Sequence, residues 1–124
     1  MAEIRLPAEA QQILIEMQMF QQQMQAVSMQ KETLSMQNVE IDKALEELTK
    51  SKETNDVYKA VGPILIKSTV KSLDSELKEK KETIDLRLKS LEKQETRVRE
   101  KLKEVQEKLE HIIKGSQSKG SSAE

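Results

Sequence analysis

Two long stretches of this sequence repeat apolar residues at alternating spacings of three and four. Position d of the heptad is apolar throughout both stretches: Leu6, Ile13, Phe20, Val27, Leu34, Ile41 and Leu48, then Val70, Leu77, Ile84, Leu91, Val98, Val105 and Ile112. Three or four such heptads already indicate a coiled coil. The chain is therefore expected to be mainly α, as two long helices.

Composition agrees with extended helices. Of the 124 residues, 35% are hydrophobic, 35% are charged and only 2% are aromatic. A globular core of this size normally uses several aromatic side chains, whereas charged, periodic sequences are typical of coiled coils. No apolar run approaches the roughly 20 residues of a membrane span, and the N-terminus lacks the pattern of a signal peptide. We expect a soluble, cytoplasmic protein without a membrane partner.

A segment of different character separates the two stretches. Gly62 and Pro63 divide two short runs rich in β-branched and aromatic residues, a pattern that predicts a β-hairpin. A single hairpin is marginal in water and requires further strands or a packing partner. We therefore expect this hairpin to be an assembly site, formed by Val57, Tyr58, Val61, Gly62, Pro63, Ile64, Leu65 and Ile66.

The hairpin allows the two helices to fold back on each other. If facing residue numbers sum to 122, each polar residue at position a faces an apolar residue at position d, as in Asn38 with Ile84 and Ile41 with Lys81. A long parallel dimer is the alternative. The predicted parts are an N-terminal extension (1–6), a first helix (7–50), a hairpin region (51–71), a second helix (72–114) capped by Ser72, and a disordered Gly/Ser-rich tail (115–124).

In the folded-back arrangement the two chain ends meet. The first helix is rich in Gln and Met near that end, with nine Gln and five Met between residues 11 and 37. Exposed Met suits binding of varied apolar partners, although single exposed apolar residues are also common on protein surfaces. The candidate binding residues at these tips are Ile13, Met17, Met19, Phe20, Leu109, Ile112 and Ile113.

Catalytic and cofactor chemistry is not indicated. The sequence has no Cys and a single histidine, His111, so it offers no zinc site of the usual kind. The glycines are too far apart for a phosphate-binding loop, and the carboxylates alternate with lysines as on a solvated helix. With a net charge of -1 the chain also lacks the basic face of a nucleic-acid binder. We expect neither an enzyme nor a cofactor.

The central motif VYKAVGPILIKS (57–68), placed between two heptad stretches, resembles the beta class of prefoldin subunits. The following KEKKETIDLRLKSLEKQE (78–95) is similar to the second helix of that family, and the resemblance covers roughly residues 6–113. One hairpin, instead of two in tandem, fits the beta class and not the alpha class.

The resemblance implies an ATP-independent chaperone. In the archaeal form of this family two alpha and four beta subunits form a hexamer in which the hairpins join into a β-barrel body. Unfolded polypeptide clients are held between the coiled-coil tips and passed to a group II chaperonin. The hairpin residues named above would then bind other subunits and the tip residues would bind clients. A structural tether or scaffold that binds no client is the alternative.

Overall fold

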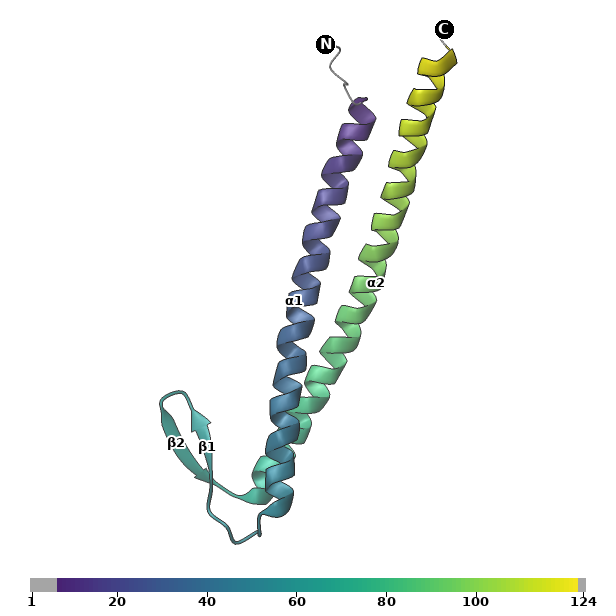
Figure 1. Ribbon diagram of the computed structural model, residues 1–124. Coiled ribbons are helices and arrows are strands. Elements are labelled where there is room, and N and C mark those ends of the chain that lie inside the picture. Colours follow the sequence, from purple (N-terminus) through teal and green to yellow (C-terminus); the bar gives the residue numbers. More distant parts are fainter. Residues whose placement is uncertain (1–6, 123–124) are drawn as a thin grey trace. The chain divides into compact units, whose positions relative to one another are not determined.

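The computed structural model describes residues 7–122, with side chains through Gly115. Helix α1 (Ala8–Lys50) is followed by strands β1 (Val57–Val61) and β2 (Ile64–Ser68) and by helix α2 (Val70–Ser122), as Figure 1 shows. This order confirms the predicted fold class, two long helices joined by one β-hairpin. Contacts divide the chain into two units, Met1–Met29 with Glu92–Glu124 and Gln30–Leu91.

Helix α1 begins and ends close to its predicted limits. The backbone N–H of Gln11 donates to the carbonyl of Pro7 at 3.0 Å, which starts the helical hydrogen bonding. Proline suits this position because its missing N–H would have no helical acceptor there. At the other end, the Ser51 hydroxyl donates to the carbonyl of Glu47 at 3.0 Å and satisfies one of the last carbonyls of the helix.

Helix α2 begins earlier than predicted, and its cap is Thr69 instead of Ser72. The Thr69 hydroxyl accepts a hydrogen bond from the backbone N–H of Ser72 at 3.1 Å, and the Thr69 carbonyl accepts one from Leu73 at 3.0 Å. Ser72 is thus inside the first turn, and the prediction that it caps the helix is wrong. The earlier start places Val70, a position-d residue, within the helix.

Helix α2 also continues past its predicted end at Lys114. Its backbone is helical through Ser122, where the Gly/Ser composition predicted disorder. A single Gly in a helix costs only about 1 kcal/mol relative to Ala, so Gly115 weakens the helix without ending it. The predicted N-terminal extension (1–6) and residues 123–124 lie outside the described residues.

Within each unit, a segment of α1 lies antiparallel beside a segment of α2 (Figure 1). Every described residue at the predicted a and d positions is buried or half-buried, whereas most other helix residues are exposed. The buried residues are Ala10, Ile13, Val27, Val98 and Val105 in the first unit, and Ile41, Ile84 and Leu91 in the second. The helices therefore pair within one chain and not as a long parallel dimer.

Polar residues in this seam bond to side chains beside it. The Asn38 amide donates to the Asp85 carboxylate at 2.8 Å, and the Lys81 ammonium lies 2.8 Å from the Asp42 carboxylate. Both partners are within one residue of those predicted by the antiparallel register. Lys81 is tolerated at the seam because its ammonium reaches the helix edge, where Asp42 and solvent are available, whereas the amide oxygen of Asn38 is buried without a hydrogen-bond partner among the described residues.

Lys81 gives a pH-dependent contribution to stability. Its hydrogen bond to Asp42 raises the pKa of Lys81 above its ordinary value of 10.5, and the charges of Asp42 and Asp85 act in the same direction. Because the folded-state pKa is the higher one, this stabilisation is complete below pH 10.5 and is lost as the pH rises through the folded-state pKa.

We expect Asp42→Asn to unfold at a measurably lower temperature than the wild type at pH 7, with a smaller difference above pH 11. Thermal unfolding followed by circular dichroism at both pH values measures this. Glu46→Gln is the control, because the Glu46 carboxylate lies 3.8 Å from the Lys50 ammonium and both side chains are exposed to solvent. A difference for Asp42→Asn that stays constant with pH would contradict the expectation.

Candidate functional site

The hairpin is a regular two-stranded antiparallel sheet. Val57 pairs with Ser68 at its base and Val61 pairs with Ile64 at its tip. Gly62 and Pro63 form the two-residue loop, and Gly62 has a φ of 56°. Glycine favours this conformation because it has no Cβ, and type II′ turns place it at this first loop position. The predicted turn is confirmed.

Both faces of the hairpin carry apolar side chains. Alternation along the strands puts Val57, Val61, Ile64 and Ile66 on one face and Tyr58, Ala60 and Leu65 on the other. The exposed fractions of the five largest of these side chains other than Val57 range from 44% at Val61 to 72% at Leu65. Ala60 is exposed too, and Val57 is half-buried. Gly62 and Pro63 are exposed too. The described part of this chain therefore leaves nearly all of the predicted assembly residues uncovered.

The hairpin edges are also open. The sheet formed by the described residues has two strands, β1 and β2, so each strand pairs on one side only. The other side of each strand presents backbone N–H and C=O groups, which are a template for pairing with another strand. A two-stranded hairpin with apolar faces and open edges is marginal in water without further strands or a packing partner.

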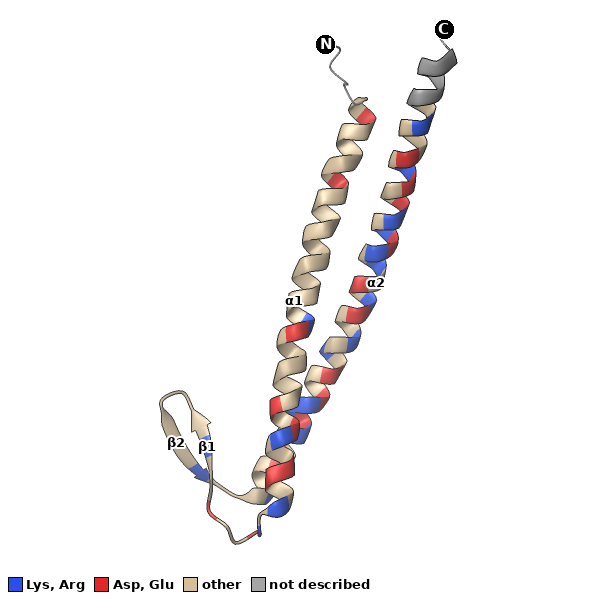
Figure 2. Ribbon diagram, viewed as in Figure 1, with Lys and Arg blue, Asp and Glu red and all other residues tan. Residues whose placement is uncertain are grey.

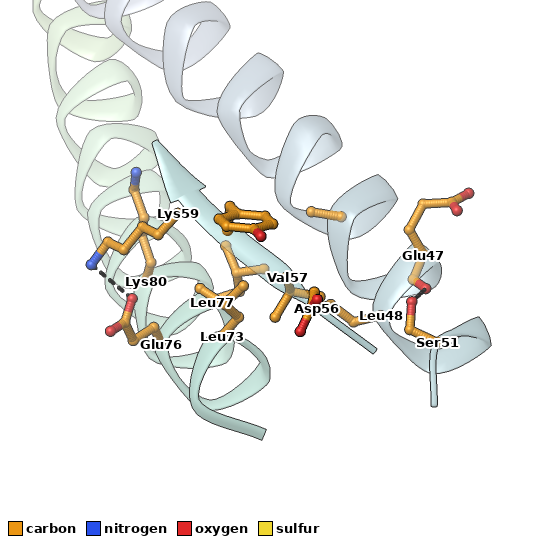
Figure 3. Close-up of a pocket in the computed structure, with 12 residues that line it drawn as sticks. Glu47, Leu48, Ser51, Asp56, Val57, Lys59, Leu73, Glu76, Leu77 and Lys80 are labelled. Atoms are coloured by element: carbon orange, nitrogen blue, oxygen red, sulfur yellow. Dashed lines mark hydrogen bonds and ion pairs between the residues drawn. The ribbon is translucent and has the colours of Figure 1, made fainter. Parts of the chain in front are cut away.

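A groove of about 730 Å³ lies where the hairpin meets the helices (Figure 3). The Lys59 ammonium, on β1, lies 2.9 Å from the Glu76 carboxylate on α2 and ties the hairpin to that helix. The heptad pattern does not predict this groove, although the apolar residue Leu73, which lies outside the a and d positions, is a sign of it in the sequence. Its walls are formed by Ala44, Glu47, Leu48, Ser51, Asp56, Val57, Tyr58, Lys59, Leu73, Glu76, Leu77 and Lys80.

The predicted tip residues lie in the other unit and differ in accessibility. Ile13 is only 8% exposed because it packs in the seam, while Met19 is exposed on the outside of α1. The remaining ones are half-buried: Met17, Phe20, Leu109, Ile112 and Ile113. The structure thus distributes these residues between the seam and the outer surface.

Residues of both helices in this unit line a shallow hollow of about 270 Å³. Met19 and Phe20 line it from α1, and Val105 and Lys108 line it from α2. The Lys101 ammonium lies 5.9 Å from the centre of the Phe20 ring, within the range of a cation–π interaction. Charged residues of α2 therefore border apolar residues of α1 here.

The described residues contain no group of three or more His, Cys, Asp or Glu side chains arranged to hold a metal ion. In the same part of the chain, no helix is both long enough and apolar enough to span a membrane.

Comparison with known proteins identifies the family. The model of the prefoldin subunit family matches residues 11–116. Relatives named prefoldin subunit beta include one from Archaeoglobus fulgidus, 41% identical with 87% of this chain and 93% of the relative covered. Another, from Pyrococcus furiosus, is 37% identical with 88% and 93% covered.

A solved structure has the same fold. The crystal structure of the prefoldin beta subunit from Thermococcus strain KS-1 is similar with a TM-score of 0.79 and 37% sequence identity, covering 86% of this chain and 94% of that one. The hairpin between two heptad helices, the family model and these relatives agree: the chain belongs to the prefoldin subunit family, and the relatives that it resembles are beta subunits.

Proposed function

We propose that this chain is a subunit of a hexameric, ATP-independent holdase chaperone of two alpha and four beta subunits. The observation that carries the proposal is the uncovered hairpin, whose apolar side chains are exposed on both faces. Burial of such side chains stabilises assembly by about 25 cal/mol per Å² of apolar surface. Neighbouring hairpins would supply strands for the open edges and apolar cover for both faces.

In this proposal the helices provide the surface that binds clients, and the hairpin provides the surface that binds the other subunits. Unfolded polypeptide binds near the chain ends and is delivered to a group II chaperonin in the cytoplasm, as the family membership suggests. No chemical step is required of the chain, since holding a client needs accessible apolar surface and not a reactive group. The proposed client residues remain Ile13, Met17, Met19, Phe20, Leu109, Ile112 and Ile113.

Suppression of aggregation tests this function. The complex of this chain with a prefoldin alpha subunit is mixed, without ATP, with citrate synthase diluted from denaturant, and light scattering is followed. We expect scattering to fall to a small fraction of its uninhibited value at stoichiometric complex. The matched control is this chain without the alpha subunit. Unchanged scattering at an excess of assembled complex would contradict the holdase and favour a tether.

A further inference from the structure

Opposite the seam, α1 carries a second row of residues at spacings of four and three. This outer stripe consists of Ile15, Met19, Gln22, Ala26 and Met29. All five are exposed, with exposed fractions of 60% at Ile15, 48% at Met19 and 62% at Met29. The 4-3 spacing keeps the stripe on one side of the helix, because residues three and four apart are neighbours on a helix surface.

Apart from Glu16 beside Ile15, the surroundings of the outer stripe are uncharged. No Asp, Glu, Lys or Arg occurs from Met17 to Gln30, although 35% of the chain is charged. In Figure 2 this part of α1 is tan, whereas the segment of α2 in the same unit shows both charge colours. The flanking side chains are exposed glutamines, among them Gln18 and Gln25. A surface without charge is unusual on a helix of a protein this highly charged.

Such a surface is poorly suited to a folded helical partner. Partner helices in coiled coils are selected by charged residues beside the apolar row, and beside the outer stripe only Glu16, at its first residue, is charged. Its exposed apolar area is on the order of a few hundred Å², less than the roughly 800 Å² per partner of a stable interface. A second copy of this chain would therefore have no charged residues to fix its register on the outer stripe, and it would bury too little surface for a stable interface.

An unfolded polypeptide matches the chemistry better. It offers apolar side chains at irregular spacing, together with backbone N–H and C=O groups that have no internal partners. Unbranched methionine adapts to apolar groups of varied shape. Glutamine carries both a donor and an acceptor, so it can bond either backbone group. The absence of charge removes repulsion toward clients of either sign.

We infer that the outer stripe binds extended, uncharged and apolar segments of unfolded clients, along the outside of α1 and away from the seam. This inference rests on the proposed holdase function and deepens it. It shifts client contact from buried seam residues such as Ile13 to exposed residues, of which only Met19 belongs to the set predicted from the sequence.

The test compares three forms of the complex with a prefoldin alpha subunit. The first is wild type, and the second carries Ile15→Gln, Met19→Gln and Met29→Gln. The third is the matched control with Leu86→Gln, an apolar α2 residue that is 63% exposed in the other unit. Glutamine keeps the helix propensity and the neutrality of the surface. The probe is a fluorescein-labelled peptide of Ser, Gln, Leu and Phe with blocked ends.

We expect the triple variant to bind this peptide about tenfold or more weakly by fluorescence anisotropy, while Leu86→Gln binds as wild type does. Raising the salt from 0.05 to 0.5 M should change wild-type binding less than twofold, because the outer stripe carries no charge. Circular dichroism and native mass check that all three forms stay folded and assembled.

The outcomes separate the two proposals. If the triple variant binds the peptide as tightly as the wild type and still suppresses aggregation, the outer stripe is not the client-binding surface. The proposed holdase function is then unaffected. Loss of peptide binding at high salt also contradicts the inference about the outer stripe, because it would show that the peptide binds the charged side chains of α2. Failure of the wild-type complex both to bind peptide and to suppress aggregation contradicts the proposed function itself.

Discussion

A chain carrying both Ile64→Asp and Ile66→Asp is expected to remain helical and to lose assembly with a prefoldin alpha subunit completely. Both residues are exposed on one face of the hairpin, so the substitutions remove little packing within the chain. In an assembled β-barrel the same face would be buried, and each unpaired carboxylate there would cost several kcal/mol. Sedimentation of the mixed subunits measures the assembly, and far-UV circular dichroism measures the helicity.

Lys67→Asp is the matched control for this experiment. Lys67 lies on the same strand but on the opposite face, pairs with Asp56 at 3.3 Å and is already polar and exposed. Its replacement changes the net charge by the same amount as the double variant but exchanges one charged side chain for another and leaves every apolar residue in place, so we expect assembly to be retained. A double variant that still sediments as the wild-type complex would show that this face of the hairpin is not an assembly surface.

The helical seam was predictable residue by residue because its cause is local. An apolar side chain at spacings of three and four can be buried only along one side of a helix. The half-buried Asn38 and Lys81 fell where the heptad count put them, and their partners Asp85 and Asp42 lie within one residue of the predicted register. The hairpin was equally readable, since Gly62 marks a turn that few other residues can form.

The helix ends were less predictable. Thr69 and Ser72 are both good capping residues, and the sequence alone does not distinguish them; in the structure Thr69 is the cap and Val70 is half-buried inside the first turn. Periodicity also shows which side of a helix faces its partner but not how accessible each seam residue is near the chain ends. Ile13 and Met19 were therefore predicted as one site, although the first is buried and the second exposed.

The arrangement separates two kinds of apolar surface within one small chain. Seam residues are satisfied by the other helix of the same chain, so they stabilise the subunit whether or not it is assembled. Hairpin residues such as Leu65 and Ile64 are mostly exposed in the described chain. Changes in the seam should therefore alter the stability of the subunit, and changes in the hairpin should alter its partners.

Ile84→Asp tests the seam half of this separation. Ile84 of α2 is 4% exposed within the second unit, and the predicted register places it against Asn38. The substitution removes buried apolar volume, which costs about 2–5 kcal/mol, and puts a carboxylate next to Asp85. We expect the isolated subunit to melt more than about 10 °C below the wild type in a calorimetric scan.

Leu86→Asp is the control, since it places the same carboxylate two positions further along the same helix on an exposed side chain. It should shift the melting temperature by no more than about 2 °C, because exposed substitutions away from packed sites are usually within about 0.5 kcal/mol of neutral. If the two variants melt alike, burial in the seam does not determine the stability of the subunit. If Ile84→Asp alone is destabilised yet still joins the complex at low temperature, stability and assembly reside in different parts of the chain, as the exposed hairpin and the buried seam require.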